Sequence, residues 1–329
     1  MKLGIFGATG LVGQSMLKIL EDRPTFKDVD LVLFASARSA GKVVSYRGKD
    51  LVIEELSEEN IKKAQLDYAL SALDASLAAE FLPIAAREGV TCIDNSSNFR
   101  MDEDKPLVVP EINLASIKEG DKIIASPNCS TIQSVIPLKP IYDHFGIKRI
   151  IYTTYQATSG SGVGGLRDLE EGVKGEEPTT YPYPIAYNLL PHIDSFLDNG
   201  YTKEEMKMIN ETRKILGDDS LAITATAVRV PVKYSHAVAI NVETEKPFSL
   251  EEVRKVLEDF EGIILEDDPA KNIYPMPLNV AGKDEVYVGR IRRDESIENG
   301  LNLWCVADNT RKGAALNTIQ ILEKVAKLA

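Results

Sequence analysis

Short apolar stretches alternate with helix-like stretches in the first third of the chain. Residues 2–6, 30–35, 67–72 and 90–93 are mostly apolar and have the length of buried β-strands. An Ala- and Leu-rich stretch from about 75 to 88 separates the last two and has the length of a helix. Strands that alternate with helices in this way predict an α/β fold with a doubly wound parallel sheet.

The pattern changes after residue 129, where longer strands follow one another with fewer regular crossovers. Strands are predicted over 148–156, up to 232, over 236–242, near 285–293 and over 301–307, and helices over 202–216 and 250–260. Thr202 and Glu205 form a capping box at the start of one helix, and Glu204 and Lys207 share a face of it, which by itself indicates an exposed ion pair. This arrangement is typical of a second, α+β domain.

The C-terminal segment predicts that the first domain is discontinuous. A helix after residue 308 carries Ile319, Leu322 and Val325 on one side. Because such an apolar face can pack back on the first domain, we expect residues 1–127 plus 310–329 to form one domain and residues 128–309 the other.

Composition and charge exclude several classes of function. The 329 residues include 38 Lys and Arg against 50 Asp and Glu, and the net charge of −12 argues against a surface that binds nucleic acid or an anionic membrane. No apolar run reaches the length of a membrane span, and glycines interrupt the N-terminal apolar residues, unlike in a signal peptide. We therefore expect a cytoplasmic protein.

The three cysteines differ in their surroundings. Cys92, Cys129 and Cys305 are too few and too scattered for a disulfide framework, and no CxxC pair indicates a metal site. Cys92 lies inside a strand pattern and is expected to pack in the core. Cys129 instead follows Pro127, where the backbone must leave an apolar strand.

Cys129 is expected to lie in the first turn of a helix, because apolar residues recur at helical spacing from Ile132 onward. Free N–H groups and the positive end of the helix dipole favour a thiolate there. Cys129 is therefore a candidate nucleophile, and the alternative is an inert, buried filler.

A glycine-rich loop follows the first strand. Residues 7–13 read GATGLVG and lead into a helical pattern, so the backbone can approach a pyrophosphate at the helix start. The spacing is G-x-x-G-x-x-G, and its place at the first strand–helix junction strengthens a motif that is weak alone. A dinucleotide cofactor is predicted here.

The end of the second strand bears on which dinucleotide binds. No acidic residue follows it to hold a ribose 2′-hydroxyl, and Ser36, Arg38 and Ser39 offer one guanidinium and two hydroxyls instead. These groups suit a 2′-phosphate, which favours NADP over NAD. The alternative is a polar loop with one solvated arginine.

Other loops indicate where an anion or a substrate binds. Arg100, in the loop 94–101, is either an anion-site residue or a surface arginine paired with a nearby acid. Residues 157–165 are rich in glycine and hydroxyl groups and form either a backbone pressed close to a ligand or a flexible connector. Arg229 and His236 flank a hairpin-like connection and can point into one site, which makes His236 the best placed of the three histidines.

These motifs together resemble those of the aspartate-β-semialdehyde dehydrogenase family over essentially the full chain. The matching segments are GATGLVG (7–13), SARSAG (36–41), DNSSNFRM (94–101), SPNCST (126–131), QATSGSG (156–162), EEMK (204–207), RVPVKYSHAVAINVE (229–243) and DNTRKGAALN (308–317). The resemblance implies reversible, NADP-dependent, phosphorylating oxidation of L-aspartate 4-semialdehyde to 4-aspartyl phosphate. This reaction serves lysine, threonine and methionine synthesis.

The resemblance also implies a role for each site residue. Cys129 would form an acyl thioester, His236 would act as acid and base, and Gln156 would orient the substrate or the histidine. The substrate and phosphate would be held by Arg229 at the α-carboxylate, Glu204 at the ammonium, and Arg100 and Lys207 at the phosphate. The NADP site would be lined by Gly7, Thr9, Gly10, Leu11, Val12, Gly13, Ser36, Arg38, Ser39, Ser159, Gly160, Ser161, Gly162 and Asn309.

Thioester chemistry explains why this set includes a thiol and two cations. Phosphate can capture a thioester as an acyl phosphate, whereas the oxygen ester of a serine would be less reactive. An enzyme that used water would not need Arg100 and Lys207 together, so the pair indicates a phosphorylating reaction.

Three alternatives stay open at this point: an N-acetyl-γ-glutamyl-phosphate reductase, a coenzyme A thioester reductase, and an NADP-binding module without chemistry. Glu204 argues against the first, because an acetylated substrate has no free ammonium. The joint presence of Cys129, Gln156 and His236 argues against the last. We also expect a homodimer formed by the second domain, with the Tyr- and Pro-rich stretch 178–191 at the interface.

Overall fold

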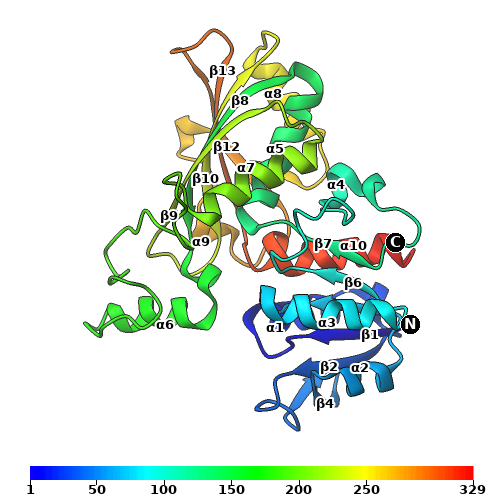
Figure 1. The fold of residues 1–329 in the computed structure, drawn as a ribbon. Helices are drawn as coiled ribbons and strands as arrows, with labels where there is room; N and C mark the ends of the chain where they lie inside the picture. Colours follow the sequence, from blue (N-terminus) through cyan, green and yellow to red (C-terminus); the bar gives the residue numbers. More distant parts are fainter. Residues whose placement is uncertain (329) are drawn as a thin grey trace. The chain divides into compact units, whose positions relative to one another are not determined.

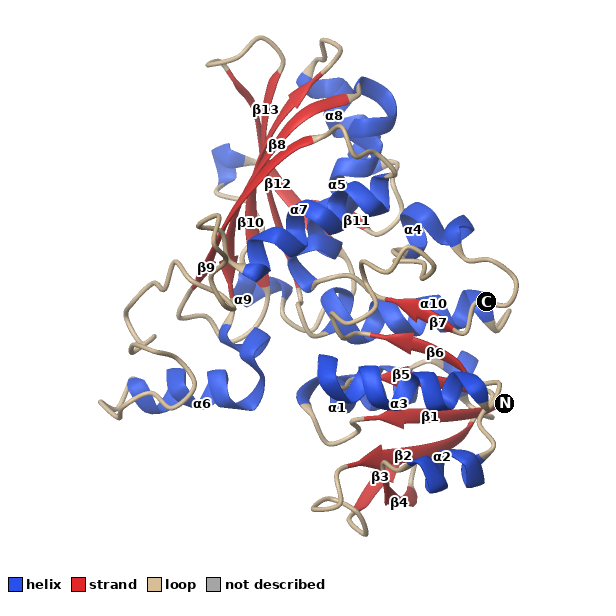
Figure 2. Ribbon diagram, in the orientation of Figure 1, coloured by secondary structure: helices blue, strands red, loops and turns tan. Residues whose placement is uncertain are grey.

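The computed structural model describes residues 1–328 (Figures 1 and 2). The chain forms two compact units, one made of Met1–Pro127 together with the segment from Ala314 onward, and one made of Asn128–Gly313. Each unit has its own sheet.

The sheet of the first unit has, within residues 1–328, seven strands in the order β3-β4-β2-β1-β5-β6-β7. The bounds are β1 Lys2–Phe6, β2 Asp30–Ala35, β3 Val43–Tyr46, β4 Lys49–Glu55, β5 Tyr68–Ser71, β6 Thr91–Asp94 and β7 Ile123–Ala125. All neighbours pair in parallel except β3 and β4, which pair antiparallel. The chain winds from β1 to both sides, as predicted for a doubly wound α/β fold.

The helices of this unit are α1 Leu11–Asp22, α2 Glu58–Ala64, α3 Ala75–Arg87, α4 Pro110–Asn113 and α10 Leu316–Val325. The C-terminal helix α10, red in Figure 1, belongs to the same core as the N-terminal strands, since Ile319 and Leu322 cluster with Met16 of α1 and Ile5 of β1. The apolar stripe seen in the sequence is thus buried inside the first unit.

The hairpin of β3 and β4 and the helix α2 escaped prediction. The outer positions of the hairpin are solvated, with Val43 56% and Val52 59% exposed. Because both faces of such an edge hairpin mix polar and apolar residues, its sequence lacks the continuous apolar run that marked the buried strands.

The sheet of the second unit has six strands in the described chain, in the order β11-β12-β13-β10-β8-β9. The bounds are β8 Ile147–Gln156, β9 Ala222–Arg229, β10 His236–Thr244, β11 Ile263–Leu265, β12 Val286–Asp294 and β13 Gly300–Ala307. The long strand β8 pairs with β9 in parallel and with β10 antiparallel. The hairpin-like connection expected between Arg229 and His236 is therefore wrong, because β8 lies between their two strands.

The helices of the second unit are α5 Cys129–Phe145, α6 Gly162–Gly172, α7 Lys203–Leu216, α8 Leu250–Glu258 and α9 Pro277–Val280. Figure 2 shows α5, α7 and α8 on one face of the sheet. The capping box predicted for α7 is present, since the Thr202 side chain accepts from the N–H of Glu205 and the Glu205 carboxylate accepts from the N–H of Thr202. Residues 158–161, expected to be a ligand-facing loop or a flexible connector, form a 3-10 turn that leads into α6.

Candidate functional site

Cys129 is the first residue of α5, as its sequence context predicted. The preceding residue, Asn128, caps the helix: its Oδ1 accepts from the N–H groups of Ser130 (2.9 Å) and Thr131 (3.3 Å). Cys129 is partly exposed, whereas Cys92 and Cys305 are fully buried and burial raises the pKa of each of these two thiols to about 12. The nucleophile candidate is thus the partly exposed cysteine at a helix N-terminus, where a thiolate is favoured.

Two buried carboxylates on α7 hold the cap residue. Glu204 accepts from the side-chain amide of Asn128 (2.8 Å), and Glu211 accepts from its backbone N–H (2.6 Å). Both carboxylates are at most 6% exposed. Sequence reasoning missed Glu211, although its spacing of seven residues from Glu204 places the two side chains on one helix face and could have pointed to it.

Gln156, the last residue of β8, joins the strand to this cap. Its amide Nε2 donates to Glu204 Oε1 (3.0 Å) and to the hydroxyl of Ser130, the residue after the thiol. Its Oε1 is buried and has no hydrogen-bond partner within residues 1–328. The geometry fits an orienting residue, because Gln156 is fixed through one end of its amide.

The ion pair expected on α7 is buried on its acidic side. Glu204 is 6% exposed and lies 3.2 Å from Lys207, which also contacts Asp194 at 2.8 Å. Burial by itself raises the pKa of Glu204, but Lys207, the amides of Gln156 and Asn128, and Arg229 outweigh burial and hold that pKa below its usual value. Glu204 is therefore a carboxylate at neutral pH.

Arg229, the last residue of β9, lies opposite Gln156 in the parallel register. Its Nη1 donates to the carbonyl of Ala157 (2.7 Å), and its guanidinium lies 5.9 Å from the Tyr181 ring centre. The side chain is 5% exposed, and its Nε has no hydrogen-bond partner in the described chain. A buried guanidinium that keeps a donor available suits a carboxylate ligand.

His236, the first residue of β10, is fully buried. Its Nδ1 accepts from the backbone N–H of Ala157 at 2.9 Å, and its Nε2 has no hydrogen-bond partner among residues 1–328. Burial, and then the charge of Arg229, hold the pKa of His236 well below its usual value. The imidazole is therefore neutral at pH 7.

Glycines and an asparagine bring these groups close together. A Cβ on Gly160 would lie 2.7 Å from Arg229 Nη1 and 3.2 Å from His236 Nε2, so the turn 158–161 packs directly on both. A Cβ on Gly313 would lie 2.9 Å from the Cβ of Cys129. Asn309, predicted in the cofactor site, accepts through Oδ1 from the Ser159 hydroxyl (3.1 Å) and the Ser235 N–H (3.0 Å) and thereby ties the turn to the residue before His236.

The predicted residues of the first unit form three loops, each after a strand. The first turn of α1 approaches the loop after β1 closely, because a Cβ on Gly13 would lie 2.3 Å from the Gly7 carbonyl oxygen, and Gly7 has a φ of +86°. This tight turn at a helix start fits a dinucleotide pyrophosphate. The remaining predicted residues are Thr9, Gly10, Leu11 and Val12 in the same loop and helix start, and Ser36, Arg38 and Ser39 after β2.

Arg100 lies in the loop after β6. It is 8% exposed, and its Nη2 donates to the carbonyl of Asn95 at 2.7 Å. The expectation of a surface position, which belonged to the alternative of an arginine paired with a nearby acid, is therefore wrong, because the side chain is buried. A buried guanidinium at the carboxyl end of a parallel strand remains suited to an anion.

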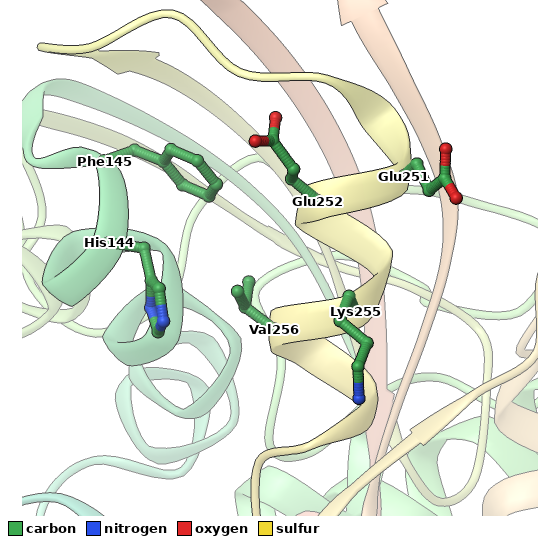
Figure 3. Close-up of a pocket in the computed structure, with 6 residues that line it drawn as sticks. All are labelled: His144, Phe145, Glu251, Glu252, Lys255 and Val256. Carbon is green, nitrogen blue, oxygen red and sulfur yellow. The ribbon is translucent and has the colours of Figure 1, made fainter.

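A cavity of about 430 Å³ lies elsewhere in the second unit, between the end of α5 and α8 (Figure 3). It is lined by His144, Phe145, Glu251, Glu252, Lys255 and Val256. His144 is one residue from the end of α5, and Cys129 is its first residue, so the two lie about 22 Å apart along the helix. None of the predicted site residues lines this cavity.

Residues 1–328 contain neither a membrane-spanning helix nor a candidate metal site. No helix there is both long and apolar enough to cross a membrane. No group of His, Cys, Asp and Glu side chains in that range is arranged to hold a metal ion.

Comparison with known proteins gives consistent matches over the whole chain. Residues 2–120 match the family described as semialdehyde dehydrogenase, NAD binding domain, and residues 138–312 match semialdehyde dehydrogenase, dimerisation domain. The aspartate-semialdehyde dehydrogenase of Aquifex aeolicus is 50% identical over 99% of this chain and 98% of that protein.

Solved structures agree with the sequence matches. The aspartate semialdehyde dehydrogenase II of Vibrio cholerae, complexed with ASA, has a TM-score of 0.95 and 46% identity, covering 99% of this chain and 98% of that one. The Candida albicans aspartate semialdehyde dehydrogenase with NADP has a TM-score of 0.77 and 28% identity, covering 100% and 99%. The first unit is thus a nicotinamide-dinucleotide-binding domain.

Proposed function

Since this chain belongs to the aspartate-semialdehyde dehydrogenase family of oxidoreductases, we propose that it interconverts L-aspartate 4-semialdehyde, phosphate and NADP with L-4-aspartyl phosphate and NADPH. The observation that carries the proposal is the partly exposed Cys129 at the N-terminus of α5, with its cap residue held by Glu204 and Glu211. In biosynthesis the flow runs toward the semialdehyde.

Cys129 supplies the nucleophile. Its thiolate attacks the aldehyde carbon, and loss of a hydride leaves an acyl thioester that phosphate captures while the thiolate departs. When bound, a nicotinamide cofactor supplies the acceptor of that hydride. The partial positive charge at the helix start lowers the cost of the thiolate in both steps.

The substrate is held by two opposite charges, Arg229 at the end of β9 and Glu204 on α7. Arg229 binds the α-carboxylate through the face of its guanidinium that the carbonyl of Ala157 leaves available. Glu204 binds the ammonium while it continues to hold Gln156, and its lowered pKa supports a negative charge there. Arg100 and Lys207 bind phosphate.

The cofactor is NADP. The loop after β1 receives the pyrophosphate, and the guanidinium of Arg38 with the hydroxyls of Ser36 and Ser39 receives the 2′-phosphate. Ser159, Gly160, Ser161, Gly162 and Asn309 line the nicotinamide side. Ser159 and Asn309 are hydrogen-bonded to each other, so a mutation of either one is expected to displace the side chain of the other.

The chain assembles as a homodimer through its second unit. Large apolar side chains between residues 183 and 196 are exposed, namely Tyr183, Tyr187, Leu189 and Phe196. Light scattering should report twice the chain mass at micromolar concentration, and Tyr187→Glu combined with Leu189→Glu should halve it. Leu278→Glu, at an exposed site on α9, is the matched control. A monomeric wild type would contradict the dimer.

The proposed reaction is tested by cofactor reduction with aspartate semialdehyde, in the presence and absence of phosphate. We expect NADPH to form only with phosphate and not at all with Cys129→Ala, whereas Cys92→Ala should stay active because its thiol is buried in β6. No reduction by the wild type, with N-acetyl-glutamate semialdehyde accepted instead, would move the substrate to that related reductase. Reduction that ignores phosphate would overturn the phosphorylating chemistry.

A further inference from the structure

The connection between α6 and α7, residues 173–202, contacts Arg229 at two points. Figure 2 draws it as a long loop beside α6. Leu190 of this connection pairs with the backbone of Arg229, since the N–H of Leu190 donates to the Arg229 carbonyl (3.0 Å) and the N–H of Arg229 donates to the Leu190 carbonyl (2.8 Å). Tyr181 of the same connection contacts the side chain, with its ring centre 5.9 Å from Cζ of Arg229. The connection thus meets both the backbone and the guanidinium of Arg229.

Two contacts determine how the guanidinium of Arg229 is oriented. Its Nη1 donates to the carbonyl of Ala157 at 2.7 Å, and the group lies over the Tyr181 ring. The Nε–H and one N–H of Nη2 run parallel along the other edge of the guanidinium, and Nε has no hydrogen-bond partner in the described chain. Such an edge can bind a carboxylate through two hydrogen bonds. The carbonyl and the ring therefore set the direction in which this edge points.

Asp168 of α6 holds the backbone of Tyr181. Its carboxylate is 4% exposed and accepts from three consecutive N–H groups, those of Thr179 (3.1 Å), Thr180 (2.6 Å) and Tyr181 (3.0 Å). Burial by itself raises the pKa of Asp168, but these backbone N–H groups outweigh burial and hold that pKa below its usual value. Asp168 is therefore a carboxylate at neutral pH, and its hydrogen bonds to residues 179–181 are charge-assisted.

The other end of Tyr181 is held where α6 lacks side chains. A Cβ on Gly165 would lie 2.6 Å from the Tyr181 hydroxyl and 2.4 Å from the Thr158 carbonyl oxygen, so only glycine leaves room for both. The hydroxyl donates to that carbonyl at 3.4 Å. Thr158 begins the turn 158–161, which packs on Arg229. Tyr181 is thus fixed by its N–H to α6 and by its hydroxyl to the turn beside the site.

We infer that Tyr181, anchored by Asp168, is a positioning residue whose ring directs the open edge of Arg229 toward the α-carboxylate of the substrate. The inference rests on the proposed function, because it requires Arg229 to bind that carboxylate. A cation held against an aromatic face is stabilised most where water is excluded, and Arg229 is buried. The ring itself touches no reacting atom and acts through the guanidinium.

The competing explanation is that Tyr181 only fills the fold. Its ring packs against a small apolar cluster that includes Leu169 and Ile185. The two roles differ in what the loss of the ring affects. A ring that orients Arg229 alters the binding of the aldehyde substrate alone, because phosphate and the dinucleotide do not need Arg229. A ring that only fills the cluster alters stability, or it alters the binding of all three substrates together.

Steady-state kinetics of Tyr181→Leu separate these roles, since leucine keeps an apolar side chain against the cluster. We expect the KM for aspartate semialdehyde to rise roughly tenfold, the size of one buried cation–π contact, with little change in kcat. The KM values for phosphate and NADP should not change. Tyr181→Phe keeps the ring and should resemble the wild type. Tyr274→Leu, at another partly buried tyrosine of the second unit, is the matched control.

Asp168→Asn tests the anchor from the other end. The amide replaces one acceptor oxygen by a donor that faces backbone N–H groups, so we expect a smaller rise in the same KM and in no other. Urea unfolding shows whether each variant is folded. An unchanged KM for aspartate semialdehyde in folded Tyr181→Leu, or an equal rise for all three substrates, would overturn the inference and leave the proposed function intact. Absence of turnover by the wild type in the same assay would overturn both.

Discussion

Side chains build the cluster around Cys129 in the second unit, whereas backbone and small residues build the loop after β1 in the first. In the cluster, the single carboxylate of Glu204 accepts from the side-chain amides of Asn128 and Gln156 and also pairs with Lys207. In the loop, the absence of a side chain at Gly13 lets α1 approach the Gly7 carbonyl.

The cluster around Cys129 and the loop after β1 are sensitive to opposite kinds of mutation. A cluster of buried polar groups is sensitive to the loss of one partner, because each remaining donor or charge is left without its acceptor. A close backbone approach is sensitive to the addition of one atom, because carbonyl oxygens cannot move aside. The predictions below test this contrast.

The largest effect is expected from Glu204→Ala, which leaves Lys207 and the amides of Asn128 and Gln156 without their shared carboxylate. We expect a loss of about 3 kcal/mol in the free energy of unfolding. Loss of nucleophile alignment should lower kcat about 100-fold. Urea unfolding and steady-state kinetics measure both, and Glu251→Ala, at an exposed position on α8, is the control. If Glu204→Ala were as stable as the wild type, the cluster would not depend on each of its partners, and the contrast with the loop would be wrong.

Gly13→Ala tests the loop by addition. The new Cβ would lie 2.3 Å from the Gly7 carbonyl oxygen and 2.8 Å from the Cα of Ala8. We expect about 2 kcal/mol of destabilisation, together with weaker dinucleotide binding. Gly10→Ala is the matched control for stability, since its Cβ would meet the same oxygen at an ordinary 3.5 Å. Urea unfolding measures both variants. An equal loss of unfolding free energy in Gly13→Ala and Gly10→Ala would contradict the prediction.

His236 couples the stability of the second unit to pH. Burial and Arg229 hold its pKa below 6.5 in the folded protein, so below pH 6.5 the unfolded chain binds a proton that the folded chain does not. The contribution of the neutral His236 to the free energy of unfolding is intact above pH 6.5. It is lost as pH falls toward the pKa of His236 in the folded protein, at up to about 1.4 kcal/mol per pH unit. Urea unfolding between about pH 6.5 and about pH 5 should show this slope in His144→Gln but not in His236→Gln.

The smallest effect is expected from Arg38→Ala in the turn after β2. Loss of one charge-assisted contact to a 2′-phosphate should weaken NADP binding roughly tenfold and leave NAD binding unchanged. The nearby exposed Lys42→Ala is the control. Fluorescence titration with both dinucleotides gives the measurement, and an equal loss for NAD and NADP would remove Arg38 from the 2′-phosphate site.

The fold was predictable where burial imposed a simple pattern. Apolar runs predicted β1, β2, β5 and β6, and the helical spacing of α10 predicted its packing into the first unit. The hairpin of β3 and β4 escaped because solvated edge strands need no such pattern. The order of β9, β8 and β10 also escaped, since residue spacing does not reveal which strand inserts between two others.

The position of Cys129 at a helix start, the capping box of Thr202 and Glu205, and the glycine loop of residues 7–13 were all visible in the sequence alone, because each depends on neighbours a few residues away. The family resemblance named the remaining site residues, and the matches to known relatives confirm that resemblance.

Only the tertiary structure decided how those residues are bonded. Glu211 meets the N–H of Asn128 across 83 positions, and Ala157 meets His236 across 79. Such bonds depend on strand order and on which helix face is buried, so they become definite only when the sheet has formed. The sequence determined which chemical groups this protein carries, and packing determined which of them can still donate, accept or react.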